Sequence, residues 1–142
     1  IYSEPEEKSR VMAQSILIST DNAHGVHPNF PNKHDENHAP VINEGLVIKV
    51  NANQRYATNS LTSSFLKNLC KKIGVPTQYF VSRGDVSCGS TIGPITAANI
   101  GVKTIDIGVP TFAMHSIREL AGTNDAYYLF QTLSTFVDIE KL

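Results

Sequence analysis

Four short apolar runs constrain the fold of this chain most strongly. They cover residues 15–20, 46–51, 77–82 and 103–108. Small polar residues, Gly or Pro bound them, and apolar runs of this length between turn residues are typical of buried strands. The run at 46–51 is interrupted by one charged residue, Lys49. We therefore predict four strands, one of which contains an unexpected lysine.

The segments between these runs favour helices. Residues 61–73 place apolar side chains at helical spacing, and Gly74 and Pro76 end that pattern. Helical character is also expected for residues 6–15, for a short segment ending at Asn99, and for most of 115–142. Helices that alternate with short apolar strands predict an α/β layered fold with a mixed, largely parallel sheet. A length of 142 residues fits one domain.

Charge and cysteine content exclude several classes of protein. Twelve basic and 13 acidic residues give a net charge of −1, which argues against a nucleic-acid or anionic-membrane partner. No apolar run approaches the roughly 20 residues that span a bilayer. Cys70 and Cys88 lie outside any CxxC motif, so we expect a reducing, cytoplasmic location and a buried structural role for Cys88.

Polar residues follow the predicted strands, where α/β folds collect their ligands. Asp21 follows the first strand, Lys49 lies near the end of the second, and His115 follows the fourth. A glycine-rich loop from Arg83 to Gly93 follows the third. If the strands are parallel, these residues meet at one edge of the sheet. This clustering is the main evidence from the residues themselves for a functional site.

Each candidate residue has both a functional and a structural interpretation. Asp21, His24 and His27 lie within seven residues, and carboxylate and imidazole groups suit Zn²⁺; the alternative is a solvated loop rich in His and Asn. Buried lysines are rare unless paired, so Lys49 either faces an anion or points outward. The stretch 88–94 either presents backbone N–H groups to an anion or simply connects a loop to a helix.

Several motifs together resemble the aspartyl aminopeptidases of the M18 metallopeptidase family. They are Ser19-Thr20-Asp21-Asn22-Ala23-His24-Gly25-Val26-His27-Pro28-Asn29, Gly45-Leu46-Val47-Ile48-Lys49-Val50-Asn51, Gln54-Arg55-Tyr56-Ala57 with Asn59, Cys88-Gly89-Ser90-Thr91-Ile92-Gly93-Pro94 and Ala113-Met114-His115-Ser116-Ile117-Arg118-Glu119. The resemblance runs in order from about Ile16 to the C-terminus. Several motifs in the right order are far more specific than any one of them.

The resemblance implies a dinuclear-zinc exopeptidase on a three-layer αβα scaffold. Asp21 matches a carboxylate ligand of one zinc ion, and His115 matches an imidazole ligand of the other. The substrate-binding residues that it implies are His24, Lys49, Tyr56, Gly89 and Gly93, with Lys49 facing the acidic side chain of the substrate. His27, His34 and His38 are expected to shape the loop or an interface.

The sequence departs from the family in length. Family members are several times longer, and their other metal ligands and general-base Glu precede the segment that matches Ile16. We therefore expect residues 1–142 to be the C-terminal part of the catalytic domain, without the upstream catalytic half or the oligomerisation domain. No catalytic residue is assigned in this chain, and the isolated segment is expected to be inactive.

The resemblance also implies partners. These are peptides with N-terminal Asp or Glu, and further copies of the complete protein in a homo-oligomer, typically a dodecamer. Two alternatives stay open. One is a relative that prefers neutral N-terminal residues, although the run from Asp21 to Asn29 favours acidic specificity. The other is a non-catalytic scaffold or assembly module that retains the fold.

Overall fold

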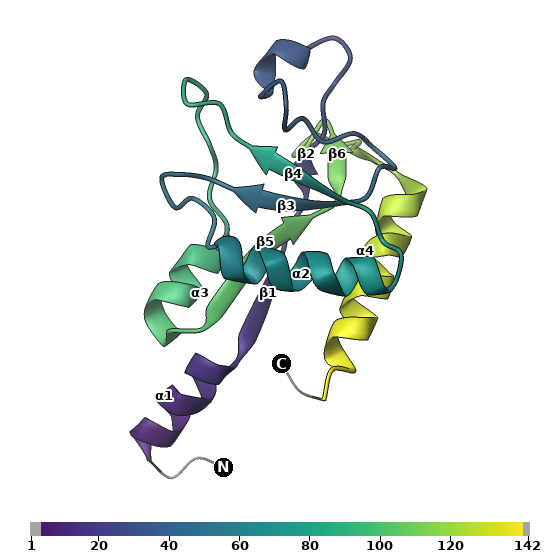
Figure 1. Ribbon diagram of the computed structural model, residues 1–142. Coiled ribbons are helices and arrows are strands. Elements are labelled where there is room, and N and C mark those ends of the chain that lie inside the picture. The colour runs from purple at the N-terminus through teal and green to yellow at the C-terminus, as the bar shows by residue number, and fades with distance from the viewer. Residues whose placement is uncertain (1–3, 141–142) are drawn as a thin grey trace.

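The computed structural model describes residues 4–140 (Figure 1). The elements along the chain are α1 (Pro5–Gln14), β1 (Ile16–Thr20), β2 (Ala23–His24), the 3-10 helix η1 (Pro31–Lys33), β3 (Leu46–Val50), α2 (Ser60–Lys72), β4 (Thr77–Val81), α3 (Ile92–Ile100), β5 (Lys103–Gly108), β6 (Pro110–Phe112), β7 (Leu120–Ala121) and α4 (Thr123–Val137). The predicted strands correspond to β1, β3, β4 and β5, each within one residue at either end.

The main sheet has the strand order β1-β5-β3-β4. β1 runs parallel to β5, and β3 runs parallel to β4. The two pairs join through an antiparallel contact in which Ile48 lies opposite Ile107. The sheet is therefore mixed, as predicted. A smaller sheet of order β2-β6-β7 adjoins it, with β2 parallel to β6.

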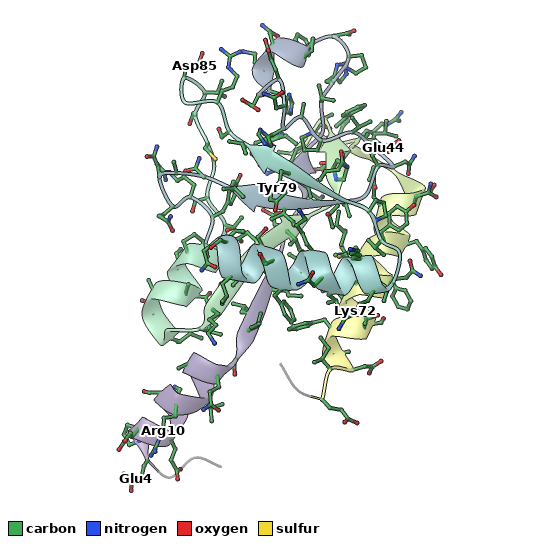
Figure 2. The ribbon with its side chains drawn as sticks, in the orientation of Figure 1. Glu4, Arg10, Glu44, Lys72, Tyr79 and Asp85 are labelled. Atoms are coloured by element: carbon green, nitrogen blue, oxygen red, sulfur yellow. The ribbon has the colours of Figure 1, made fainter. Side chains whose placement is uncertain are left out.

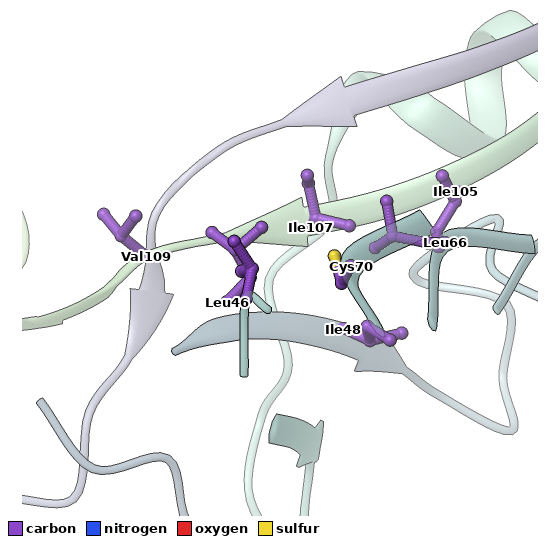
Figure 3. Close-up of a cluster of buried hydrophobic side chains, with 8 residues drawn as sticks. Leu46, Ile48, Leu66, Cys70, Ile105, Ile107 and Val109 are labelled. Atoms are coloured by element: carbon purple, nitrogen blue, oxygen red, sulfur yellow. The ribbon is translucent and has the colours of Figure 1, made fainter. Parts of the chain in front are cut away.

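Side chains alternate between the two faces of the main sheet. Leu46 and Ile48 of β3 join Ile105 and Ile107 of β5 in the larger core, together with Leu66 and Cys70 of α2 (Figure 3). Val47 belongs to a separate cluster with Tyr56 and Phe80. Helices α2 and α4 cover the face that carries Leu46 and Ile48, and α3 packs against β1 and β5. This arrangement confirms the predicted α/β architecture, and it leaves the Val47 face open to the site.

Helix α2 begins where the sequence supplies a complete cap. The Asn59 side chain accepts a hydrogen bond from the Thr62 backbone N–H at 3.0 Å, and the Thr62 hydroxyl accepts one from the Asn59 N–H at 3.1 Å. This capping box satisfies donors that a helix start otherwise leaves free. Leu66 and Cys70, four residues apart, are both fully buried against the sheet. The helix is therefore held by its cap and by its packing.

The C-terminal helix is shorter than predicted. Helical character was expected from His115 onward, but α4 begins at Thr123, and residues 113–121 form a turn followed by β7. Ala113 and His115 adopt left-handed backbone conformations, with φ of 55° and 68°, which a right-handed helix cannot include. The prediction for 115–122 is wrong for this reason, and residues 141–142 of the predicted helix lie outside the described residues.

Helix α1 stands apart from the rest of the molecule. It extends beyond the end of the main sheet, and Glu4 and Arg10 project away from the body (Figures 1 and 2). None of its residues is buried.

Within residues 4–140, no helix combines the length and apolarity needed to cross a membrane.

Candidate active site

A cavity of about 580 Å³ opens over the sheet face that carries Lys49. Segment 25–45, with η1, and the loop between β4 and α3 rise beyond the same end of the sheet (Figure 1). Six of the seven predicted site residues line the cavity: Asp21, His24, Lys49, Tyr56, Gly89 and His115. The expectation that they meet at one carboxyl edge is wrong, because β3 and β4 run opposite to β1 and β5. The residues meet instead where loops fold over the sheet.

Lys49 is the buried cation of the cavity. Its exposed fraction is 2%, and its Nζ lies 3.6 Å from Oδ2 of Asp21 and 5.5 Å from the centre of the Tyr56 ring. Burial lowers the pKa of Lys49, and the nearby carboxylates of Asp21 and Asp106 oppose that shift. The structure therefore resolves the two interpretations of Lys49: the side chain points inward, toward an anion.

Tyr56 and Cys88 form the wall beside Lys49. The Tyr56 hydroxyl accepts a weak hydrogen bond from Sγ of Cys88 at 3.5 Å, and the Tyr56 ring lies 6.3 Å from that of Phe80. Burial and the Cys88 contact raise the pKa of Tyr56, so its phenol stays protonated. Cys88 is only partly buried and lines the cavity. The expectation of a buried structural cysteine is therefore wrong at Cys88, whereas Cys70 is fully buried.

His24 approaches the cavity from the short strand β2. Its ring lies 6.4 Å from Phe80, and its carbonyl oxygen lies 3.3 Å from Nε2 of His34. Partial desolvation lowers the pKa of His24, and the charges of His34, His115 and Lys49 add to this effect. His24 is therefore shifted toward the neutral imidazole, which can donate and accept a hydrogen bond at once.

Asp21 is placed by a close approach of two backbone segments. Its N–H donates to the Ile107 carbonyl oxygen at 3.0 Å, directly after β1 ends. A Cβ at Gly108 would overlap the Asp21 carbonyl oxygen, so this crossing requires glycine. The Asp21 carboxylate has an exposed fraction of 62% and lies on the cavity rim.

His115 is placed by a strained turn. Its backbone is left-handed, and its N–H donates to Oε1 of Glu119 at 2.7 Å. A non-glycine residue in this conformation costs about 1–3 kcal/mol, and the Glu119 contact offsets part of that cost. The sequence pattern did not single out Glu119. The only sequence signal for it is its place four residues after His115.

Gly93 does not line the cavity. It lies in the first turn of α3, where a Cβ would overlap both carboxylate oxygens of Asp106. Asp106 is fully buried, and it accepts hydrogen bonds from the Ala57 N–H and the Thr91 hydroxyl, both at 2.6 Å. Asp106 thus joins the Tyr56 segment to the start of α3. A carboxylate inside an apolar run was its only signal in the sequence.

Asp21 and His115 fit a metal ion as part of a ligand set. Both side chains are accessible from the cavity, and carboxylate oxygen and imidazole nitrogen are donors that Zn²⁺ accepts. Within the described part of the chain, no group of three His, Cys, Asp or Glu residues could hold a metal ion.

A family model and several known proteins match this chain. The model of the aminopeptidase I zinc metalloproteases (M18) matches residues 1–137. A probable M18 family aminopeptidase 2 of Pseudomonas aeruginosa (strain UCBPP-PA14) is 59% identical over all 142 residues, which cover 33% of that relative. The chain thus spans about a third of the length of the curated relatives it matches.

Solved structures agree with this match. In the cryo-electron microscopy structure of the Ape4 and Nbr1 complex, one chain is 45% identical, with a TM-score of 0.92 over 95% of this chain and 26% of its own length. A chain of the S. cerevisiae mApe1 dodecamer is 32% identical, with a TM-score of 0.83 over 96% of this chain and 30% of its own. The fold of this chain is therefore shared with M18 aminopeptidases.

Proposed function

Because the chain belongs to the M18 family of zinc metallopeptidases, we propose that its parent protein is an aminopeptidase that removes acidic residues from peptide N-termini. In this proposal, residues 1–142 form the C-terminal part of the catalytic domain. The site then lies between this part and the rest of the parent. The short coverage of the relatives supports this, since the chain matches only about a third of them.

The observation that carries the proposal is the burial of Lys49. A buried ammonium group without a close counter-charge is costly, and its nearest carboxylate, on Asp21, lies at the long distance of 3.6 Å. A substrate carboxylate in the cavity would supply a further counter-charge, in addition to Asp21 and Asp106. A neutral side chain would leave Lys49 without that partner, so the alternative specificity for neutral residues is disfavoured.

The other cavity residues would orient the substrate. Tyr56 and Phe80 exclude water on one side of Lys49 and so strengthen its attraction for a carboxylate. His24, which also lines the cavity, would supply an imidazole N–H donor to the same group or to the adjacent peptide oxygen. These contacts hold the N-terminal residue in one orientation, which places its peptide bond toward Asp21 and His115 on the rim.

Asp21 and His115 would each hold a zinc ion, as the family resemblance implies. The bound metal would supply an activated water and would polarise the peptide carbonyl. The remaining ligands and the general-base Glu would come from the rest of the parent, so residues 1–142 alone would be inactive. This also separates the proposal from a scaffold role, since a scaffold module needs no such upstream residues.

We also propose that the parent forms a homo-oligomer, as a dodecamer. The dodecameric mApe1 relative supports this proposal. So do the apolar side chains that the chain leaves exposed on α3, where Ile92 and Ile95 have exposed fractions of 71% and 62%. The two free cysteines support a cytoplasmic location.

Activity of the full-length parent tests the proposal. We expect kcat/KM for a substrate with N-terminal Asp to exceed that for the matching Leu substrate by at least about tenfold, which corresponds to roughly 1.4 kcal/mol. An equal or greater value for the Leu substrate would overturn the acidic specificity. Absence of all aminopeptidase activity from a zinc-loaded, correctly assembled parent would favour the scaffold role.

A further inference from the structure

The cavity has aromatic lining residues to which the binding of one acidic residue gives no role. They are His27, Phe30 and Phe112. The His27 ring lies 5.5 Å from that of Phe30 and 5.1 Å from that of Phe112, and both pairs are tilted. These distances are typical of favourable aromatic contacts. We call these three residues the aromatic end of the cavity.

The aromatic end is open to a ligand. Phe30 has an exposed fraction of 56%, although apolar rings are usually covered. Its position is held from the backbone, because the Phe30 N–H donates to the His27 carbonyl oxygen at 2.9 Å and the Asn29 N–H donates to Nδ1 of His27 at 3.1 Å. Ligand pockets are concave and lined mainly by apolar and aromatic side chains, and Phe30 lines this cavity with its ring accessible.

The aromatic end adjoins the part of the cavity that His24 lines, through β2 and β6. His24 of β2 lies opposite Thr111 of β6, and the next N–H, that of Gly25, donates to the Thr111 carbonyl oxygen at 3.0 Å. A Cβ at Gly25 would lie 3.1 Å from the Phe112 ring, so the glycine lets Phe112 pack close to the strand that carries His24. One continuous wall therefore connects the aromatic end with His24.

The size of the cavity fits more than one residue. Its volume of about 580 Å³ lies within the range of roughly 300–1,000 Å³ that holds drug-sized ligands. An extended peptide advances about 3.3 Å per residue. Lys49 and the wall formed by β2 and β6 line the same cavity, so a peptide whose first side chain lies at Lys49 would place its next residue along that wall.

We propose that His27, Phe30 and Phe112 form a subsite for the second residue of the substrate, and that this subsite prefers aromatic side chains. The inference rests on the proposed function, which places the N-terminal residue at Lys49. The preferred substrates are then peptides with an acidic first residue and an aromatic second residue. A small second residue leaves the Phe30 ring exposed, and a charged one meets an apolar surface.

The experiment compares peptides that differ only at the second residue. The full-length parent is assayed on peptides with N-terminal Asp followed by Phe, Ala or Lys. We expect kcat/KM to be about tenfold higher for Asp-Phe than for Asp-Ala, and lowest for Asp-Lys. Phe30→Ala should reduce the Asp-Phe to Asp-Ala ratio to about one. Phe130→Ala is the matched control, since Phe130 lies on α4, outside the cavity, with a similar exposed fraction of 66%.

Two results would overturn the subsite. One is a wild-type ratio near one, and the other is a Phe30→Ala variant that keeps the wild-type ratio. Failure of the proposed function is seen separately, in the ratio between peptides with N-terminal Asp and Leu and the same second residue. If the parent does not prefer N-terminal Asp over Leu, the peptides with Phe, Ala or Lys as the second residue are made with N-terminal Leu instead. Equal kcat/KM values for these three peptides would also overturn the subsite.

Discussion

The Nζ atom of Lys49 lies 3.6 Å from Oδ2 of Asp21, but the two side chains differ sharply in their surroundings. The lysine side chain has an exposed fraction of 3%, whereas that of the aspartate is 62%. The lysine therefore carries most of the desolvation cost of the pair, and the aspartate stays hydrated. This asymmetry determines what happens when either partner is replaced.

Lys49→Met should stabilise the folded parent. Methionine has a similar length, removes the buried charge and leaves Asp21 in water, so we expect a gain of about 1 kcal/mol. Thermal unfolding midpoints of the two proteins measure this. Lys103→Met is the control, because Lys103 is exposed at the start of β5 and its replacement should change stability by less than about 0.5 kcal/mol. A marked destabilisation by Lys49→Met would mean that Lys49 is a structural ion-pair partner.

The same lysine predicts how stability changes with alkaline pH. Burial lowers the pKa of Lys49 in the folded state below 10.5, the usual value that we take for the unfolded state. At any pH between the folded and the unfolded pKa, the unfolded state therefore binds more protons. The contribution of Lys49 to stability should therefore rise with pH in that window, up to about 10.5. Lys49→Met should remove this rise. The difference between the unfolding midpoints of the two proteins, measured from pH 8 to pH 10, should shrink as the pH increases.

Gly89, in the loop before α3, and Gly93, in the first turn of α3, should respond differently to the same replacement. Gly93→Ala places a methyl group against the buried Asp106 carboxylate and should destabilise the protein by about 1–3 kcal/mol. Gly89→Ala meets no atom within 4 Å and should change stability by less than about 0.5 kcal/mol. Unfolding midpoints of both variants give the comparison. Equal effects would contradict the placement of Gly93 beneath the cavity wall.

Asp21 and His115 should control the zinc content of the parent. Asp21→Ala and His115→Ala each remove one ligand, so we expect less bound zinc per protomer and a loss of several orders of magnitude in kcat. Mass spectrometry of the metal content gives a readout independent of activity. Asp138→Ala and His38→Ala are matched controls, since neither residue lines the cavity. Full zinc occupancy in both cavity variants would refute the assigned roles.

The four strands could be predicted because each is a short apolar run with turn residues on both sides. Strand direction could not, because a run such as Leu46–Val50 reads the same whichever way its neighbour runs. The antiparallel pairing of Ile48 with Ile107 joins strands that are far apart in the sequence, and the local sequence does not determine it. Because of this pairing, the site lies over a face of the sheet and not at the edge where the parallel arrangement would have placed it.

The site residues also divide into those that the sequence could predict and those that it could not. Asp21, Lys49 and His115 could be singled out because they are polar residues beside predicted strands. Asp106 and Glu119 could not, because their partners depend on tertiary structure: the Ala57 N–H is 49 residues from Asp106, and the left-handed turn at His115 creates the contact with Glu119. The helical spacing after residue 123 also concealed that turn.

The selectivity of a Lys49→Met variant of the full-length parent tests the central claim most directly. The measurement is the ratio of kcat/KM for matched substrates with N-terminal Asp and Leu, with Lys33→Met as the control for a cation that lines the same cavity but is exposed. If Lys49 pairs with the substrate carboxylate, its loss costs roughly 2–5 kcal/mol. The Asp-to-Leu ratio should then fall by about 30-fold or more, while Lys33→Met leaves it nearly unchanged. Equal losses on both substrates in the Lys49 variant would contradict the claim, and the acidic specificity would have to come from other residues.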